Sequence, residues 1–141
     1  MSYAFAQYRS SQVSTASPAQ VIVQFYDGAL KFIRRAHEAL VNKDIPGKGV
    51  ALSRAHAVVS ELRLNLDTER APELSAELDR LYVFVLDRIS EANIKCEAKP
   101  LDAAIKVLEE LRSAWAELAE VPLAGRQAST SQVIITGQVG K

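Results

Sequence analysis

The sequence has little of the chemistry that would mark several common protein classes. Its 141 residues include one cysteine, Cys96, so no disulfide can form within the chain, and this fits a reducing compartment. The 17 basic and 17 acidic side chains cancel, which leaves no overall charge to attract nucleic acid. No apolar run approaches the roughly 20 residues of a membrane-spanning helix, and the N-terminus does not resemble a signal peptide. These absences favour a cytosolic protein that neither binds nucleic acid nor spans a membrane.

Convergent reactive groups are also missing. The sequence contains no HExxH motif, no Glu-x-x-His pair and no glycine-rich phosphate loop. Cys96 has no histidine beside it, so a structural or incidental role fits it best. We therefore predict a protein that is not an enzyme, with no catalytic residue, cofactor or metal. One alternative is a histidine phosphotransfer domain acting through His56, although the following "AVVSEL" lacks the H-x-x-K-G pattern of such domains.

What the sequence does contain is four helical segments separated by short turns. Ser17, Pro18 and Gln20 form a capping box with proline at the first helical position, and Pro72 and Pro100 open two later helices. The segments span roughly 18–42, 47–66, 72–95 and 100–119. Short turns favour antiparallel neighbours, so we predict an all-α, up-down-up-down four-helix bundle.

The two ends differ in composition from this middle part. Residues 1–17 are rich in serine and glutamine but carry aromatic side chains, so we predict an N-terminal arm or cap. Residues 120–141 are uncharged over long stretches and are predicted to be a disordered tail. The predicted division is therefore an arm at 1–17, a bundle at 18–119 and a tail at 120–141.

The first helix carries more apolar surface than one neighbour needs. Its apolar residues fill roughly 200° of arc when residues are placed about 100° apart. Either this is a central helix that touches two neighbours, or part of the arc lines a groove for another polypeptide; the two are compatible. Gly28 interrupts the helix at a cost of about 1 kcal/mol, which a close approach of a helix or the arm would explain. Asp27 is expected to face solvent or to form a hydrogen bond with a turn or the N-terminal segment. The Tyr26 hydroxyl is expected to need water or a partner at the rim.

Further apolar residues lie away from the expected core of the later helices. Val50, Ala57 and Leu64 recur every seven residues on the second helix, which indicates a second contact seam. This seam leaves open another alternative, a structural bundle that dimerises through it. On the third helix Phe84 falls off the core stripe, whereas Trp115 on the fourth is expected to anchor the core.

The stretch "QYRSSQVSTASPAQVIVQFYDGALKFIRRA" resembles the N-terminal signature of the FliS family, the flagellin-specific export chaperones of bacteria. Further matches are "VVSELRLNLD", "LDRLYVFVLDRISEANI" and "LEELRSAW", in order and at helix-length spacing. Two features depart from the family pattern: Val23-Gln24 replaces a more usual Leu-Met, and the C-terminal extension is long. The residues that carry the first match are Tyr8, Val13, Thr15, Ala16, Ser17, Pro18, Tyr26, Asp27, Gly28, Ala29, Leu30, Arg34 and Arg35.

The resemblance implies a cytosolic chaperone that binds the disordered C-terminal region of flagellin, about one to one. Binding would prevent premature polymerisation and keep flagellin competent for type III flagellar export. The arm would cover the apolar groove, and other export components are possible further partners. We predict partner binding through side chains of the arm and of the first three helices, namely Tyr8, Val13, Tyr26, Leu30, Ile33, Leu62, Leu66 and Phe84.

Overall fold

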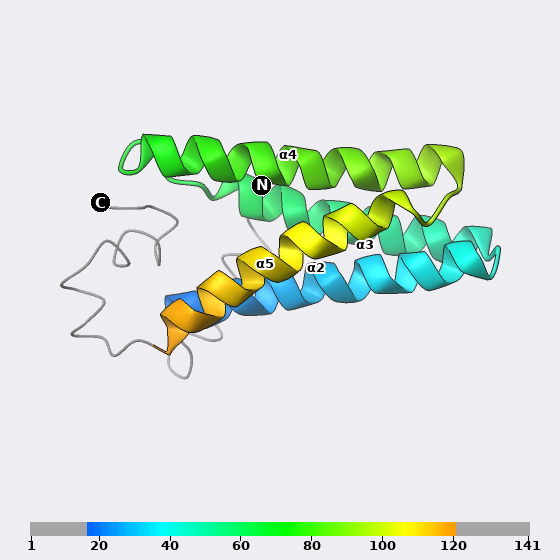
Figure 1. Ribbon diagram of the computed structural model, residues 1–141, viewed down its shortest axis with the longest axis horizontal. Helices are drawn as coiled ribbons and strands as arrows, with labels where there is room; N and C mark the ends of the chain where they lie inside the picture. The colour runs from blue at the N-terminus through cyan, green and yellow to red at the C-terminus, as the bar shows by residue number, and fades with distance from the viewer. Residues whose placement is uncertain (1–16, 121–141) are drawn as a thin grey trace.

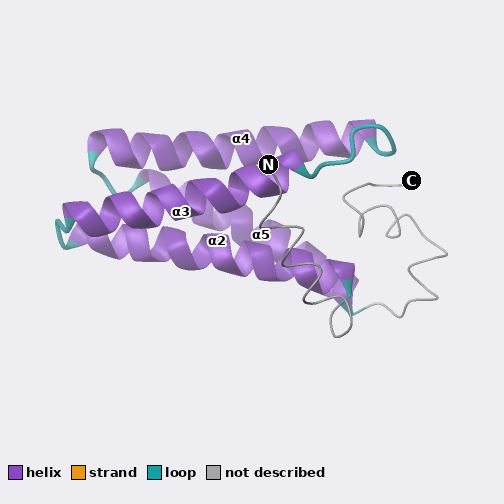
Figure 2. Cartoon of the chain, turned by 180° about the vertical axis from the view of Figure 1, so that it is seen from behind, coloured by secondary structure: helices purple, strands orange, loops and turns teal. Residues whose placement is uncertain are grey.

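Four helices lie side by side in the computed structural model, which describes residues 17–120 (Figure 1). They are α2 (Pro18–Val41), α3 (Ile45–Leu64), α4 (Pro72–Lys95) and α5 (Pro100–Ala119). Successive helices run in opposite directions, and α5 crosses α2 obliquely (Figure 1). Residues 17–120 contain no strand (Figure 2). The predicted all-α, up-down-up-down bundle is therefore confirmed, whereas the predicted arm and tail lie almost wholly outside the described residues.

The start of α2 forms as the sequence predicts. The Gln20 backbone N–H donates to Ser17 Oγ at 3.1 Å, and the Ser17 backbone N–H donates to Gln20 Oε1 at 2.8 Å. Pro18 occupies the first turn, where its missing N–H leaves no hydrogen bond unmade. This capping box satisfies two backbone donors at the helix end and fixes where α2 begins.

The start of α3 corrects a prediction. The segment around Pro46 was expected to be a turn, but α3 already begins at Ile45. Asp44 is the N-cap, and its Oδ1 accepts a hydrogen bond from the Gly47 backbone N–H at 3.1 Å. Since proline is tolerated in the first helical turn, Pro46 marks the beginning of this helix and not the loop before it.

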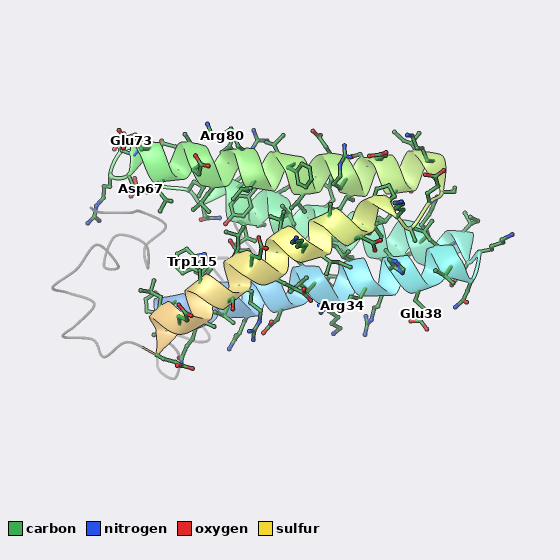
Figure 3. The ribbon with its side chains drawn as sticks, viewed as in Figure 1. Arg34, Glu38, Asp67, Glu73, Arg80 and Trp115 are labelled. Atoms are coloured by element: carbon green, nitrogen blue, oxygen red, sulfur yellow. The ribbon has the colours of Figure 1, made fainter. Side chains whose placement is uncertain are left out.

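In the core α2 packs against both α3 and α5, as each helix of the bundle packs against two others. Its buried side chains therefore surround much of the helix, and the central-helix interpretation of its wide apolar arc is confirmed. Trp115 of α5 is buried, as predicted, while Arg34, Glu38 and Arg80 project outward (Figure 3). The buried apolar residues of α2 are Ala19, Val21, Tyr26, Ala29, Leu30, Ile33, Ala36, Ala39 and Leu40.

Gly28 has no packing role within the described part of the chain. A Cβ atom placed there would meet no atom within 4 Å, so no neighbouring helix approaches closely. The prediction that a helix closes on Gly28 is wrong, and the arm lies outside the described residues.

None of the described helices has an apolar stretch that could cross a lipid bilayer.

Candidate partner-binding face

Apolar side chains remain at the surface where α2 and α3 run antiparallel to each other. Val50 and Leu64 of α3 are 56% and 63% exposed, and Ala57, midway between them at heptad spacing, is exposed as well. On α2, Phe25, Gly28 and Phe32 recur on one side of the helix and are all partly exposed. We name this surface the α2–α3 face and define it by Phe25, Gly28, Phe32, Val50 and Ala57, whereas Leu64, at the end of the same seam, lines a separate pocket with residues of α4.

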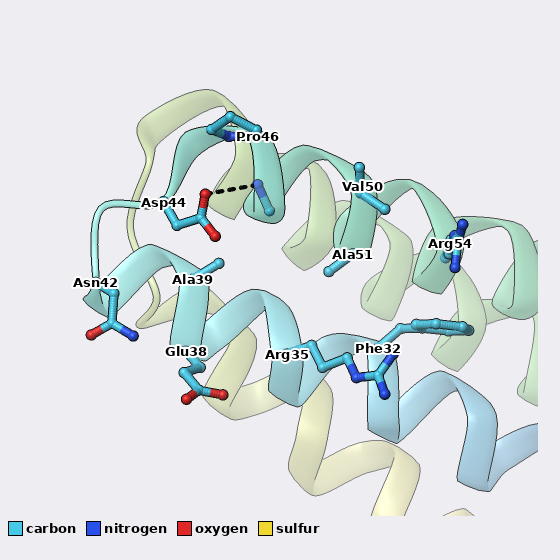
Figure 4. A pocket seen from close by; sticks show the side chains of 11 residues that line it. Phe32, Arg35, Glu38, Ala39, Asn42, Asp44, Pro46, Val50, Ala51 and Arg54 are labelled. Atoms are coloured by element: carbon cyan, nitrogen blue, oxygen red, sulfur yellow. Dashed lines mark hydrogen bonds between the residues drawn. The ribbon is translucent and has the colours of Figure 1, made fainter.

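A groove with a volume of about 650 Å³ opens on this face, near the turn between α2 and α3 (Figure 4). Phe32 lies at one end and Pro46 at the other, with Val50 and Ala51 between them (Figure 4). Both helices contribute its lining residues, which are Phe32, Arg35, Glu38, Ala39, Asn42, Asp44, Pro46, Gly47, Val50, Ala51 and Arg54. A concave surface that combines apolar and charged side chains in this way suits an amphipathic segment of another polypeptide.

Positive side chains gather at one end of the groove and negative side chains line the other. At the Phe32 end, the Arg35 and Arg54 guanidinium carbons lie 6.0 and 5.9 Å from the ring centroid, and Lys31 Nζ lies 5.9 Å from it. Glu38 and Asp44 line the groove toward the helix turn. The cations favour the face of the aromatic ring, and they make the Phe32 end attractive to negative charge.

The opposite side of α2 is closed by ion pairs to α5. Asp27 accepts from Arg112, Arg34 donates to Glu109, and His37 Nε2 lies 3.3 Å from Asp102 Oδ1. The hydrogen bond from Arg112 to Asp27, together with the charge of that carboxylate, raises the pKa of Arg112. Asp27 is exposed, as expected, and its partner is Arg112 of α5 rather than a turn.

A buried polar contact joins α2 to α4 beneath these surfaces. The hydroxyl oxygens of Tyr26 and Tyr82 lie 2.6 Å apart, within hydrogen-bond distance. Burial raises the pKa of Tyr82 to about 12, and burial together with the neighbouring Tyr82 raises the pKa of Tyr26. Both hydroxyls therefore stay protonated at neutral pH and act as a structural link between the helices.

The side chains at the α3–α4 contact show no arrangement typical of catalysis. Lys48 is buried, and its Nζ lies 3.3 Å from the Asn93 carbonyl oxygen and 3.4 Å from Cys96 Sγ. His56 is exposed, with its Nδ1 3.4 Å from Ser60 Oγ. Among residues 17–120, no group of three His, Cys, Asp or Glu side chains is placed to hold a metal ion.

Comparison with known proteins shows the family to which the chain belongs. Residues 1–122 match the family described as "Flagellar protein FliS". The chain belongs to the FliS family. It is 36% identical to the Pseudomonas aeruginosa flagellar secretion chaperone FliSB over 105 residues, which are 74% of this chain and 83% of that protein.

Relatives from other bacteria agree with this family. The Salmonella typhimurium flagellar secretion chaperone FliS is 33% identical over 117 residues, which are 82% of this chain and 87% of that protein. The Vibrio cholerae flagellar secretion chaperone FliS is 32% identical over 108 residues, or 77% and 79% of the two chains. Since FliS proteins are named as chaperones, a non-enzymatic role, the prediction that this chain is not an enzyme is confirmed.

Half of the residues predicted to bind a partner lie in the core of this FliS-family chain. Tyr26, Leu30, Ile33 and Leu62 are buried between helices, so a partner would reach them only if the bundle opened. The apolar arc of α2 that suggested Tyr26, Leu30 and Ile33 packs against α3 and α5, and Leu62 belongs to the same core from α3.

The other predicted residues are divided between the surface and the arm. Leu66 is half-buried after α3, beside exposed Leu64, and Phe84 is 39% exposed on α4 with the Arg88 guanidinium carbon 5.4 Å from its ring centroid. Tyr8 and Val13 lie outside the described residues. Of the predicted set, therefore, Leu66 and Phe84 remain surface candidates in residues 17–120.

The groove contains residues that the predicted set omitted. Val50 was recognised as part of a seam, but Phe32, Arg35 and Arg54 were not connected with it. The available signal was the seven-residue spacing from Phe25 to Phe32, which places both rings on one side of α2. The register between α2 and α3, which brings Arg54 to Phe32, was not visible in either helix alone.

Proposed function

We propose that this chain is an export chaperone that binds the C-terminal segment of flagellin along the α2–α3 face. The observation that carries the proposal is the partly exposed apolar surface formed by Phe32 and Val50 on a FliS-family bundle. The family name and the names of the relatives support a flagellar secretion client, and the apolar surface supports a client that presents apolar side chains. Binding takes place in the cytosol, before the client is exported.

The mechanism follows from the cost of ordering a flexible segment. A disordered client loses conformational entropy when it binds, so many apolar contacts must compensate for that loss. An extended face along two helices offers such contacts over a long stretch of client. Covering the client's own assembly surfaces in this way prevents premature polymerisation and leaves the segment unfolded enough for export.

Calorimetry tests this proposal with the full chain and a peptide from the C-terminal region of the cognate flagellin. Saturable binding near one to one is expected, and it should weaken in the variant Val50→Ser, which changes a residue that lines the groove. Ile94→Ser is the matched control, because Ile94 is 81% exposed and lies on α4, outside the α2–α3 face. Absence of heat, together with absence of a complex in gel filtration, would end the proposal. Equal weakening by Ile94→Ser would show that binding does not depend on the α2–α3 face.

The N-terminal segment has its own role in this proposal. Residues 1–17 cover the apolar face in the free chaperone and move away when the client binds. Removal of residues 1–15 is expected to increase the binding of a hydrophobic dye and to leave the unfolding transition of the bundle in place. Unchanged dye binding would contradict the covering role.

A second candidate function is self-association through the seam of Val50, Ala57 and Leu64. Their exposure on α3 favours it, because three exposed positions at heptad spacing suit packing against another helix. Light scattering distinguishes the two functions. A mass that doubles with concentration and is lost in Val50→Ser/Leu64→Ser supports a dimer, whereas a constant monomer mass rules it out.

A further inference from the structure

Two arginines at the Phe32 end of the groove have no carboxylate partner in the described part of the chain. No ion pair among residues 17–120 includes Arg35 or Arg54, although both are exposed and line the groove. Most other arginines in this range are paired with acids on the same or a neighbouring helix. These pairs are Arg34–Glu109, Arg63–Asp79, Arg80–Glu77, Arg88–Glu91 and Arg112–Asp27.

Arg35 and Arg54 both place their guanidinium groups near one aromatic ring, unlike an arginine that extends freely into solvent. Their guanidinium carbons lie 6.0 and 5.9 Å from the centroid of the same Phe32 ring, one coming from α2 and the other from α3. A guanidinium held near an aromatic ring keeps N–H groups available at its edge, and that edge matches the geometry of a carboxylate. Val50 and Ala51 continue the groove from this point as an apolar floor.

We propose that Arg35 and Arg54 receive an acidic side chain of the bound client, next to an apolar client residue that packs on Phe32 and Val50. The inference rests on the proposed chaperone function and adds a charge requirement to it. The occupant is thus an amphipathic segment with a carboxylate beside its apolar anchors. The acidic end of the groove, with Glu38 and Asp44, repels the same carboxylate, so the charges also fix the direction in which the segment lies.

Calorimetry with the full chain and the flagellin C-terminal peptide provides the test, at low and at high salt. The variant Arg35→Gln/Arg54→Gln removes both charges and keeps the first two methylene groups of each side chain. Its affinity is expected to fall about tenfold at low salt, with a smaller salt dependence than that of the wild type. Arg70→Gln is the matched control. Arg70 is an exposed arginine outside the groove, and no ion pair within residues 17–120 includes it.

A set of peptides identifies the client side of the contact. Each acidic residue of the peptide is replaced in turn by its amide, and the loss in affinity is measured with the wild type and with Arg35→Gln/Arg54→Gln. One replacement should weaken binding to the wild type and have little further effect on the double variant, since both changes remove the same contact. Equal affinity of the wild type and the double variant would overturn the inference while leaving the chaperone function intact. A wild type that does not bind the peptide would instead overturn the proposed function.

Discussion

The hydroxyl groups of Tyr26 and Tyr82 lie 2.6 Å apart inside the bundle and connect α2 to α4. These two helices are not consecutive in the chain, and α3 and α5 each pack against both of them. Burying two hydroxyls costs free energy unless each finds a partner; here each serves the other, and Tyr26 also has a hydrogen bond with Trp115. The pair therefore fixes how α2 and α4 face each other across the core.

A double-mutant cycle on this pair should show strong coupling. Tyr26→Phe and Tyr82→Phe are each expected to lower the free energy of unfolding by about 1–2 kcal/mol, because each removes the hydrogen bond between the two buried hydroxyls. The double variant should lose less than the sum of the two, since it removes both polar groups together. Urea denaturation measures all four proteins, and strictly additive losses would show that the hydroxyls do not interact.

The same pair predicts a loss of stability in alkali. An unfolded tyrosine loses its proton near pH 10, whereas burial raises the pKa of Tyr82 to about 12 in the fold. The native state therefore binds more protons than the unfolded state between about pH 10 and 12, and the free energy of unfolding falls as the pH rises through this window. The expected slope is about 1.4 kcal/mol per pH unit for each buried tyrosine.

Urea denaturation at a series of pH values measures this slope. The double variant Tyr26→Phe/Tyr82→Phe serves as the control, because its other titrating groups are unchanged. The wild type should lose stability more steeply than the variant above pH 10, and both should be nearly flat just below it. Parallel curves for the two proteins would contradict the burial of protonated hydroxyls.

Two glycines in helical segments should respond in opposite ways to alanine. Gly28→Ala is expected to raise the free energy of unfolding by about 0.5–1 kcal/mol, since the added methyl group meets no atom within 4 Å and alanine favours the helix. Gly47→Ala should lower it, because the new Cβ would collide with the Asp44 carboxylate that caps α3. Thermal or urea denaturation distinguishes the two, and a destabilising Gly28→Ala would indicate a contact that the bundle does not show.

Leu30 and Phe84, both predicted from the sequence to bind a partner, should behave very differently when truncated. Leu30→Ala is expected to cost about 2–5 kcal/mol of unfolding free energy, because Leu30 is buried in the core. Phe84→Ser should cost much less, since that ring is 39% exposed on α4. Circular dichroism during urea denaturation measures both losses. Comparable losses would mean that the assignment of Leu30 to the core, or of Phe84 to the surface, is wrong.

The fold was largely predictable because its signals are local. Ser17, Pro18 and Gln20 form a start signal within four residues, and the apolar spacing defines each helix without reference to its neighbours. The beginning of α3 was misjudged for a local reason too, because Pro46 was assigned to the turn although Asp44 caps the helix before it.

The binding surface was less predictable, because it depends on which helices are neighbours. The wide apolar arc of α2 suits a groove or a second helix equally well. Only the packing of the neighbouring helices on α2 shows that Leu30 and Ile33 are buried in the core. Likewise, Arg54 reaches Phe32 only through the register of α3 on α2. Side-chain periodicity within one helix contains no information on that register.

Site-specific photo-crosslinking tests most directly whether the client binds on the α2–α3 face. A photoreactive phenylalanine analogue replaces Val50 in one full-length protein and Ile94 in another, and each is irradiated with the flagellin C-terminal peptide. Both positions are exposed, so neither change should unfold the bundle. If the client binds on this face, a covalent complex forms with the probe at position 50 and little or none forms with the probe at position 94. A complex that forms at position 94 but not at position 50, or at neither, would contradict binding on this face.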